Sequence, residues 1–286
     1  MPQPIILDFD RSVSPLPGES RVDLAAWQEE VRFGCTLRTL AKLERAIEGS
    51  LPDSNWAIFL GSGDYHHVSH ILIRRLRQLQ RPLQVVVLDN HPDNMRYPFG
   101  IHCGSWVWHV SRLPFISCVH VLGITSSDVE IGHAVEHHVL NLRSGRVRYW
   151  CVGPNLGWMR ALGIGRNASF PSVAAMLDAF AAELRGSDDG IYLSLDKDVL
   201  SPEDAHTNWD QGVMRMEEML EMVTLLKGRV VATDVTGEVS VYAYRSRLKR
   251  LLSGLDRQPR IAPHDLMRWQ AEHHAINLRL LDALSG

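Results

Sequence analysis

Carboxylate and imidazole side chains stand at the ends of four apolar runs in this sequence of 286 residues. The four polar groups are Asp64–His67, Asp89–Asp93, Asp196–Asp198 and Asp234–Glu238. One such group alone is weak support for a site, because an aspartate after a strand often caps a loop. Several carboxylates gathered at one place would repel one another, and some would be forced to take up protons. A divalent cation removes this repulsion, so the repeated pattern predicts a metal site.

The types of donor atom narrow the choice of metal. Aspartate and histidine without cysteine suit Mn²⁺, Zn²⁺, Fe²⁺ or Ni²⁺, and the excess of carboxylates favours Mn²⁺. The donors are numerous enough for two ions. Two ions about 3.5–4 Å apart can hold one water between them and lower its pKa, which provides a nucleophile at neutral pH. We therefore expect two divalent metal ions, with Mn²⁺ as the best match.

The apolar runs that precede the polar groups predict a parallel sheet. Most of them lack strict alternation of apolar and polar residues, as expected of strands that are buried on both faces. The expected strands are Ile5–Phe9, Trp56–Leu60, Gln84–Leu88, Cys118–Gly123, Tyr149–Val152, Gly190–Leu195 and Arg229–Val235. The expected helices are Leu37–Ile47, Val68–Leu79, Ser172–Leu184, Glu217–Leu226, Tyr242–Leu255 and Asp265–Leu284, and Gly153–Pro171 is expected to be a loop. This alternation predicts one α/β domain with a mostly parallel sheet, whose ligands bind at the carboxyl ends of the strands.

The composition argues against several other classes of protein. Hydrophobic residues make up 45% and charged residues 22% of the chain, which is ordinary for a globular domain. The net charge of −3 gives no electrostatic reason to expect nucleic acid or a membrane surface as a partner. The N-terminus has no signal-peptide pattern, and no run approaches the ~20 apolar residues of a membrane span. Four cysteines without a CxxC motif indicate reduced thiols, so we expect a cytoplasmic protein.

The order and spacing of the polar groups resemble those of the arginase/ureohydrolase superfamily. Its members carry Gly-Gly-Asp-His-Ser, then Asp-Ala-His-Thr-Asp, then Ser-Phe-Asp-Val-Asp, and finally a strand that ends in Glu. The matching segments here are Gly63–His66, Asp89–Asp93, Ser194–Asp198 and Asp234–Glu238, so the match extends from about residue 55 to 240. The resemblance implies a single arginase-like α/β domain over residues 1–286, a three-layer sandwich with a mostly parallel sheet of roughly eight strands. It also implies a metal-dependent amidinohydrolase.

The resemblance implies a role for each matching residue. The implied metal ligands are His66, Asp89, His91, Asp93, Asp196 and Asp198, with His67 as the alternative to His66. Asp93 would pass a proton to the leaving amine, and His102 would exchange protons with solvent. Glu238 would pair with two N–H groups of a guanidinium, although an extra glycine precedes it here.

Three departures from the superfamily pattern concern the substrate. Met95 stands where enzymes that act on free arginine carry an asparagine that holds the amino-acid end. Thr207–Gly212 replaces a loop rich in threonine and glycine, and Lys197 stands between two ligands where an apolar residue is usual. The pattern resembles a divergent branch that includes peptide arginases, which convert arginine to ornithine within ribosomal peptides. We therefore expect a peptide or small guanidino substrate, with release of urea.

Several alternatives remain open at this stage. The same centre could act on agmatine, a guanidino acid, a formimino group or an acetylated amine, and the deacetylase relatives also use an adjacent histidine pair. Ile5–Ser12 reads as a strand followed by D-x-D-x-S, which suits the aspartyl nucleophile and Mg²⁺ of a haloacid-dehalogenase phosphatase. A binding protein that keeps its metal as a structural element is the third alternative. Members of the superfamily are commonly oligomeric, so a homo-oligomer is also open. The pairs His137-His138 and His273-His274 are interpreted as solvated helix faces.

Overall fold

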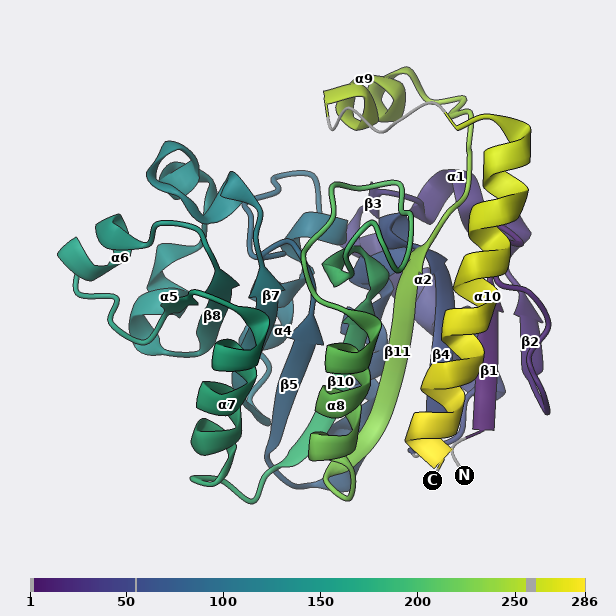
Figure 1. Ribbon diagram of the computed structural model, residues 1–286. Coiled ribbons are helices and arrows are strands. Elements are labelled where there is room, and N and C mark those ends of the chain that lie inside the picture. Colours follow the sequence, from purple (N-terminus) through teal and green to yellow (C-terminus); the bar gives the residue numbers. More distant parts are fainter. Residues whose placement is uncertain (1–2, 55, 256–260, 286) are drawn as a thin grey trace.

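A nine-stranded sheet forms the centre of the protein, in a computed structural model that describes residues 3–54, 56–255 and 261–285. The strand order is β2-β1-β4-β11-β10-β5-β7-β8-β9, and neighbouring strands run parallel (Figure 1). The strands are β1 (Gln3–Asp8), β2 (Ser20–Asp23), β4 (Trp56–Ser62), β5 (Leu83–Leu88), β7 (Ile116–Ile124), β8 (Val147–Val152), β9 (Ala168–Phe170), β10 (Gly190–Asp196) and β11 (Val230–Glu238). A separate antiparallel pair joins β3 (Gly34–Cys35) to β6 (Ile101–His102).

Both faces of the sheet are covered, which explains why the central strands lack alternation. Ile58 and Leu60 of β4 belong to one apolar cluster, whereas Ala57 and Phe59 belong to the other. Helices α7, α8 and α10 pack on one face, and α2, α3 and α4 pack on the opposite face (Figure 1). The helices are α1 (Gln28–Val31), α2 (Leu37–Ile47), α3 (Ser69–Arg75), α4 (Trp106–Ser111), α5 (Val139–Ser144), α6 (Gly157–Ala161), α7 (Val173–Leu184), α8 (Met216–Leu226), α9 (Arg247–Leu255) and α10 (Pro263–Ser285).

The predicted three-layer α/β class with a parallel sheet is confirmed, and the differences lie at the margins. The sheet has nine strands, because β2 and β9 add short outer strands that carry too few apolar residues to stand out. The prediction that Gly153–Pro171 is a loop is wrong, since it contains α6 and β9. Ser172, the first residue of an expected helix, caps α7 by accepting a hydrogen bond from the Ala175 amide at 3.2 Å. Within the part of the chain that the structure describes, no helix combines the length and apolar character that crossing a bilayer requires.

Candidate metal centre

The carboxyl ends of four adjacent strands, β4, β11, β10 and β5, bring the predicted site residues together. His66 lies in the 3-10 helix η3 (Gly63–Val68), which follows β4 directly. Asp89 follows β5, and Asp196 ends β10, where the 3-10 helix η8 (Lys197–Val199) begins with Asp198 in its first turn. The sheet edge therefore collects side chains that are far apart in the sequence.

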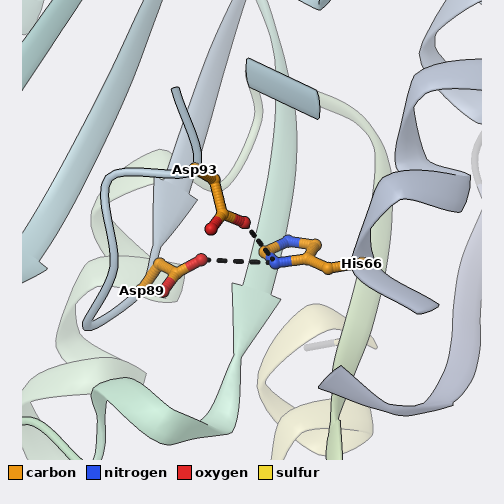
Figure 2. A group of neighbouring side chains, drawn as sticks. All are labelled: His66, Asp89 and Asp93. Carbon is orange, nitrogen blue, oxygen red and sulfur yellow. Dashed lines mark ion pairs between the residues drawn. The ribbon is translucent and has the colours of Figure 1, made fainter. Parts of the chain in front are cut away.

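The first cluster surrounds the Nδ1 atom of His66. This nitrogen lies 3.1 Å from Asp93 Oδ2, 3.2 Å from Asp89 Oδ2 and 3.3 Å from Asp196 Oδ2. Figure 2 shows the His66 ring facing Asp89 and Asp93. All four side chains are buried. One ring N–H can point at only one of three oxygens, so this arrangement fits a cation held between the four groups better than a hydrogen bond.

The other ring nitrogen of His66 has a fixed partner. Its Nε2 lies 2.9 Å from Ser194 Oγ, and the Ser194 hydroxyl donates to Asp234 Oδ1 at 2.7 Å. Since the hydroxyl proton is used on Asp234, Ser194 accepts a hydrogen bond from Nε2–H. Neutral His66 then keeps a lone pair on Nδ1, the atom that faces the carboxylates. Partners of this kind orient metal-binding histidines and select the tautomer that can bind.

The second cluster consists of Asp89, His91 and Asp198. The Nδ1 atom of His91 lies 2.9 Å from Asp198 Oδ2 and 3.6 Å from Asp89 Oδ1. Its Nε2 donates to Asp210 Oδ1 at 2.9 Å, which again leaves Nδ1 as the atom able to bind a metal. Asp89 thus offers Oδ2 to the first cluster and Oδ1 to the second. A carboxylate shared in this way suits two neighbouring ions.

The charges of the site are not balanced by the protein alone. Burial raises the pKa of Asp93 to about 7, and the charge of Asp89 adds to the rise. Burial also raises the pKa of Asp198, with Asp196 and Asp89 adding to it. Burial acts to lower the pKa of His66, but the surrounding aspartates outweigh it and raise the pKa well above its ordinary value. Burial is the largest cause of the shifts at Asp93 and Asp198, and the carboxylate repulsion expected from the sequence adds to it. The residues present fit two divalent cations, which would relieve this repulsion.

Two positions with positive φ, Asp93 and Gly237, allow the backbone to place the carboxylates of the site. Asp93 has a φ of 46°, which turns the chain after Asp89 so that both carboxylates reach His66. The indole of Trp106 donates to Asp93 Oδ2 at 2.7 Å and holds the turn. Gly237 has a φ of 88°, and a Cβ there would lie 2.4 Å from Asp196 Oδ1. Only glycine allows β11 to pass so close to the carboxylate of Asp196.

A cavity of about 560 Å³ opens above the two clusters. This volume lies within the usual range for small-molecule sites. Its walls include Phe33, Met95, His102 and Trp209, together with three carboxylates outside the clusters, Asp128, Glu136 and Asp210. Among the residues that the structure describes, no lysine or arginine lines the cavity. The cavity is therefore suited to a cationic group.

His102, expected to exchange protons with solvent, lies in the wall of this cavity. Its Nδ1 accepts a hydrogen bond from the Gly104 amide at 2.9 Å, so the neutral ring carries its proton on Nε2. Burial lowers the pKa of His102 to about 4, and His109 adds to the decrease. At neutral pH the ring is an uncharged hydrogen-bond donor.

Glu238, expected to hold the substrate guanidinium, does not belong to the cavity wall. Its carboxylate is buried and pairs with the ammonium group of Lys197, which is also buried. Asn277 of α10 donates to the same oxygen at 2.7 Å, and His273 Nδ1 lies 3.7 Å from the other oxygen. Because a cation of the protein occupies Glu238, a guanidinium in the cavity must find another anion.

Other histidines differ from their sequence interpretations. His67, the alternative ligand, belongs to neither cluster, and its Nε2 lies 3.9 Å from Cys35 Sγ. The interpretation of the two histidine pairs as solvated faces is wrong for His137 and His273, because both are fully buried. His137 donates to the Asp128 carbonyl at 2.7 Å, and His273 donates to the His206 carbonyl at 2.6 Å.

The D-x-D-x-S motif at the end of β1 is part of a structural network. Asp8 forms an ion pair with Arg21 at 2.8 Å. Asp10 accepts hydrogen bonds from Ser12 Oγ and Ser240 Oγ, each at 2.6 Å, and pairs with Arg32 at 3.4 Å. Both carboxylates are thus engaged within the protein, which does not support the phosphatase alternative.

Comparison with solved structures identifies the fold, whereas no family model matches the chain. An uncharacterized protein of Thermotoga maritima is 25% identical over 193 residues, and this match spans 67% of the present chain and 62% of that protein, less than two thirds of its length. The structure superimposes on formimidoylglutamase from Bacillus subtilis with a TM-score of 0.54 at 17% identity, covering 99% of this chain and 86% of that one. For arginase from Bacillus caldovelox the TM-score is 0.51 at 14% identity, covering 86% and 73%. The arginase-like fold expected from the sequence is confirmed.

Proposed function

Because a chain with the arginase fold carries two histidine–carboxylate clusters at its ligand-binding edge, we propose that it is a metal-dependent amidinohydrolase. The observation that carries this proposal is Asp89, which faces both clusters, one oxygen to each. His66, Asp93 and Asp196 would complete the first ion's ligands, and His91 and Asp198 the second's. When bound, two divalent cations supply Lewis acidity and a water of lowered pKa at neutral pH. The donor set of carboxylates and imidazoles without a thiolate suits Mn²⁺ best.

The remaining residues would position the substrate and move protons. A guanidinium is delocalised and permanently charged, so its carbon is a poor electrophile that must be held in place. Asp93 lines the cavity and is oriented by Trp106, and we assign it the transfer of a proton to the leaving amine. His102 lines the same cavity, and we assign it the exchange of protons with solvent. Because the pKa of His102 is low, its ring soon loses any proton that it takes up. This property suits the exchange of protons with solvent rather than their retention.

We propose further that the substrate is an arginine side chain within a peptide, converted to ornithine with release of urea. Glu238 is paired to Lys197 and Asp210 to His91, so Asp128 and Glu136 are the carboxylates of the described cavity wall that remain to bind the guanidinium. The absence of lysine and arginine from the described cavity wall leaves a free α-carboxylate without a counter-ion. Met95 in the wall offers no strong hydrogen bond to an α-amino group. An arginine within a peptide needs neither contact.

Mass spectrometry tests both parts of this proposal. Mn²⁺-loaded protein is incubated separately with an arginine-containing peptide, free arginine, agmatine, N-formiminoglutamate and an acetyl-lysine peptide, beside the Asp89→Asn variant as control. Conversion of the peptide alone, lost in the variant, is the expected result. Conversion of free arginine or formiminoglutamate would contradict the substrate assignment. Conversion of acetyl-lysine alone would point to a deacetylase, and stoichiometric metal without any hydrolysis would refute the enzymatic proposal.

A further inference from the structure

The chain forms two 3-10 helices after β7, η6 (Ser127–Val129) and η7 (Ile131–Glu136), at the mouth of the cavity. Asp128, His133 and Glu136 of this segment line the cavity wall. We propose that residues 127–137, called the lip below, bind the residues on either side of the target arginine in a peptide substrate. This inference rests on the proposed function and adds the surface that selects the peptide.

The lip has one polar side and one apolar side. Residues i and i+3 of a 3-10 helix lie on the same face. His133 and Glu136 are so related; both line the cavity, and His133 Nδ1 lies 3.3 Å from Glu136 Oε1. Ile131 and Val135 fall on the other two faces of the helix, where they are 74% and 79% exposed. The lip therefore presents polar groups to the cavity and exposed apolar side chains to the solvent outside it.

The exposed apolar residues belong to a well-anchored segment. His137 donates to the Asp128 carbonyl at 2.7 Å and closes the lip on itself. Trp158 donates to the Val129 carbonyl at 2.9 Å, and the Arg96 amide donates to the Glu136 carbonyl at 2.7 Å. Scattered apolar residues are ordinary on protein surfaces. Here two of them belong to an anchored segment whose other side chains, Asp128, His133 and Glu136, line the cavity. A surface that is already ordered loses little entropy when it binds a ligand.

The charge of the cavity wall indicates which kind of group the cavity binds. The cavity wall combines the predicted metal-binding aspartates with Asp128, Glu136 and Asp210, and among the described residues that line it there is no lysine or arginine. A cation such as the guanidinium of an arginine therefore matches the charge of this wall. When that side chain reaches the clusters, its backbone and its neighbours in the peptide remain at the mouth, next to Ile131 and Val135. Apolar neighbours of the arginine would bury against them.

The test compares the wild-type protein with the Ile131→Ser/Val135→Ser double variant, both loaded with Mn²⁺. The substrates are a Leu-Arg-Leu peptide, a Ser-Arg-Ser peptide of equal length, and agmatine. Binding of the fluorescently labelled Leu-Arg-Leu peptide to metal-free protein is followed by anisotropy as a readout independent of turnover. Partial burial of two apolar side chains predicts a roughly five- to twentyfold rise in KM and Kd for the Leu-Arg-Leu peptide. Values for the Ser-Arg-Ser peptide and agmatine should stay within about twofold.

A matched control is Leu225→Ser. Leu225 is 45% exposed and lies in the last turn of α8, next to the amino end of β11 and so at the opposite edge of the sheet. It should leave every value unchanged. Equal KM and Kd values for the Leu-Arg-Leu peptide in the wild type and the double variant would refute the proposed role of the lip. A double variant that differs from the wild type only in self-association, measured by size-exclusion chromatography, would refute it as well. If the wild-type protein converts agmatine but no peptide, the proposal of a peptide substrate fails. That result differs from the previous one, in which the peptide is converted but Ile131 and Val135 do not contribute to its binding.

Discussion

Glu238 and Lys197 provide the sharpest test of the site, because the sequence and the structure assign them different tasks. If Glu238 holds the substrate, Glu238→Gln removes turnover and leaves the fold intact. In the structure, however, both side chains are buried and neutralise each other, and Lys197 directly follows the predicted ligand Asp196. Glu238→Gln then leaves the Lys197 ammonium buried without a counter-charge. We expect the variant to lose stability first, and activity as a consequence.

The expected size of the effect follows from the burial of the pair. Lys197 is 0% exposed, so its ammonium cannot reach water without local unfolding. Removing one partner of a buried ion pair costs about 3–5 kcal/mol. Giving up the lysine proton at pH 7 costs about 1.4 kcal/mol for each unit below its ordinary pKa of 10.5, hence about 5 kcal/mol at most. The two estimates agree, so Glu238→Gln should lower the free energy of unfolding by about 3–5 kcal/mol.

Urea denaturation of four proteins measures this effect: wild type, Glu238→Gln, Lys197→Met, and the double variant. The double variant removes both charges and keeps an acceptor for Asn277, so it should be more stable than either single variant, with a coupling free energy above about 2 kcal/mol. It should also recover part of the turnover that Glu238→Gln loses. A Glu238→Gln protein that is as stable as wild type yet inactive would refute this reasoning and return Glu238 to the substrate.

Three further outcomes follow from the same structure. Ser194→Ala removes the acceptor of His66 Nε2–H, and should weaken Mn²⁺ binding, measured by calorimetry, about 10- to 100-fold; an unchanged affinity would remove the tautomer argument. Asp128→Asn should raise KM for the arginine peptide at least tenfold while Mn²⁺ affinity stays within about twofold; an unchanged KM would mean that Asp128 does not bind the guanidinium. Burial lowers the pKa of His120 to about 3, so its contribution to stability is complete above the unfolded pKa near 6.5 and declines as the pH falls from there towards 3. His120→Gln, which can still accept from the Trp150 indole, should flatten the acid side of the stability curve by up to about 1.4 kcal/mol per pH unit; denaturation at pH 7 and pH 5 shows whether it does.

Much of the fold was predictable, because the buried strands carry unbroken apolar runs. The predicted Gln84–Leu88 and Gly190–Leu195 lie within one residue of β5 and β10. Polar residues that follow such strands reach the same sheet edge, which is why the sequence could predict that Asp89 and Asp196 lie close together. The edge strands β2 and β9 escaped prediction because their residues are only partly buried and lack that signal.

The partners of the site residues were harder to predict, because they come from distant parts of the chain. Glu238 and Lys197 are 41 positions apart, and nothing in either segment indicates that their side chains meet. Asp210, which fixes His91, lies in a loop whose sequence resembles no ligand motif. His273 left a usable signal: with Ile276 and Leu280 it shares the i, i+3, i+7 spacing of a buried helix face. That spacing outweighs the polar character of the pair His273-His274.

The hydrogen bonds between the lip and the segment after Asp93 have a thermodynamic consequence. The Arg96 amide donates to the Glu136 carbonyl of the lip, and the amide of His138, the residue after the lip, donates to the Asn94 carbonyl at 3.2 Å. Asp93 and the lip are therefore neighbours along a continuous set of backbone bonds. With the proposed function, a metal ion that shifts the Asp93 turn would also shift the lip. Peptide binding at the lip would then change the metal affinity by the same factor as metal binding changes the peptide affinity. Peptide affinity would then depend on whether metal is bound, and metal affinity on whether peptide is bound. Measuring either dependence gives the size of the other.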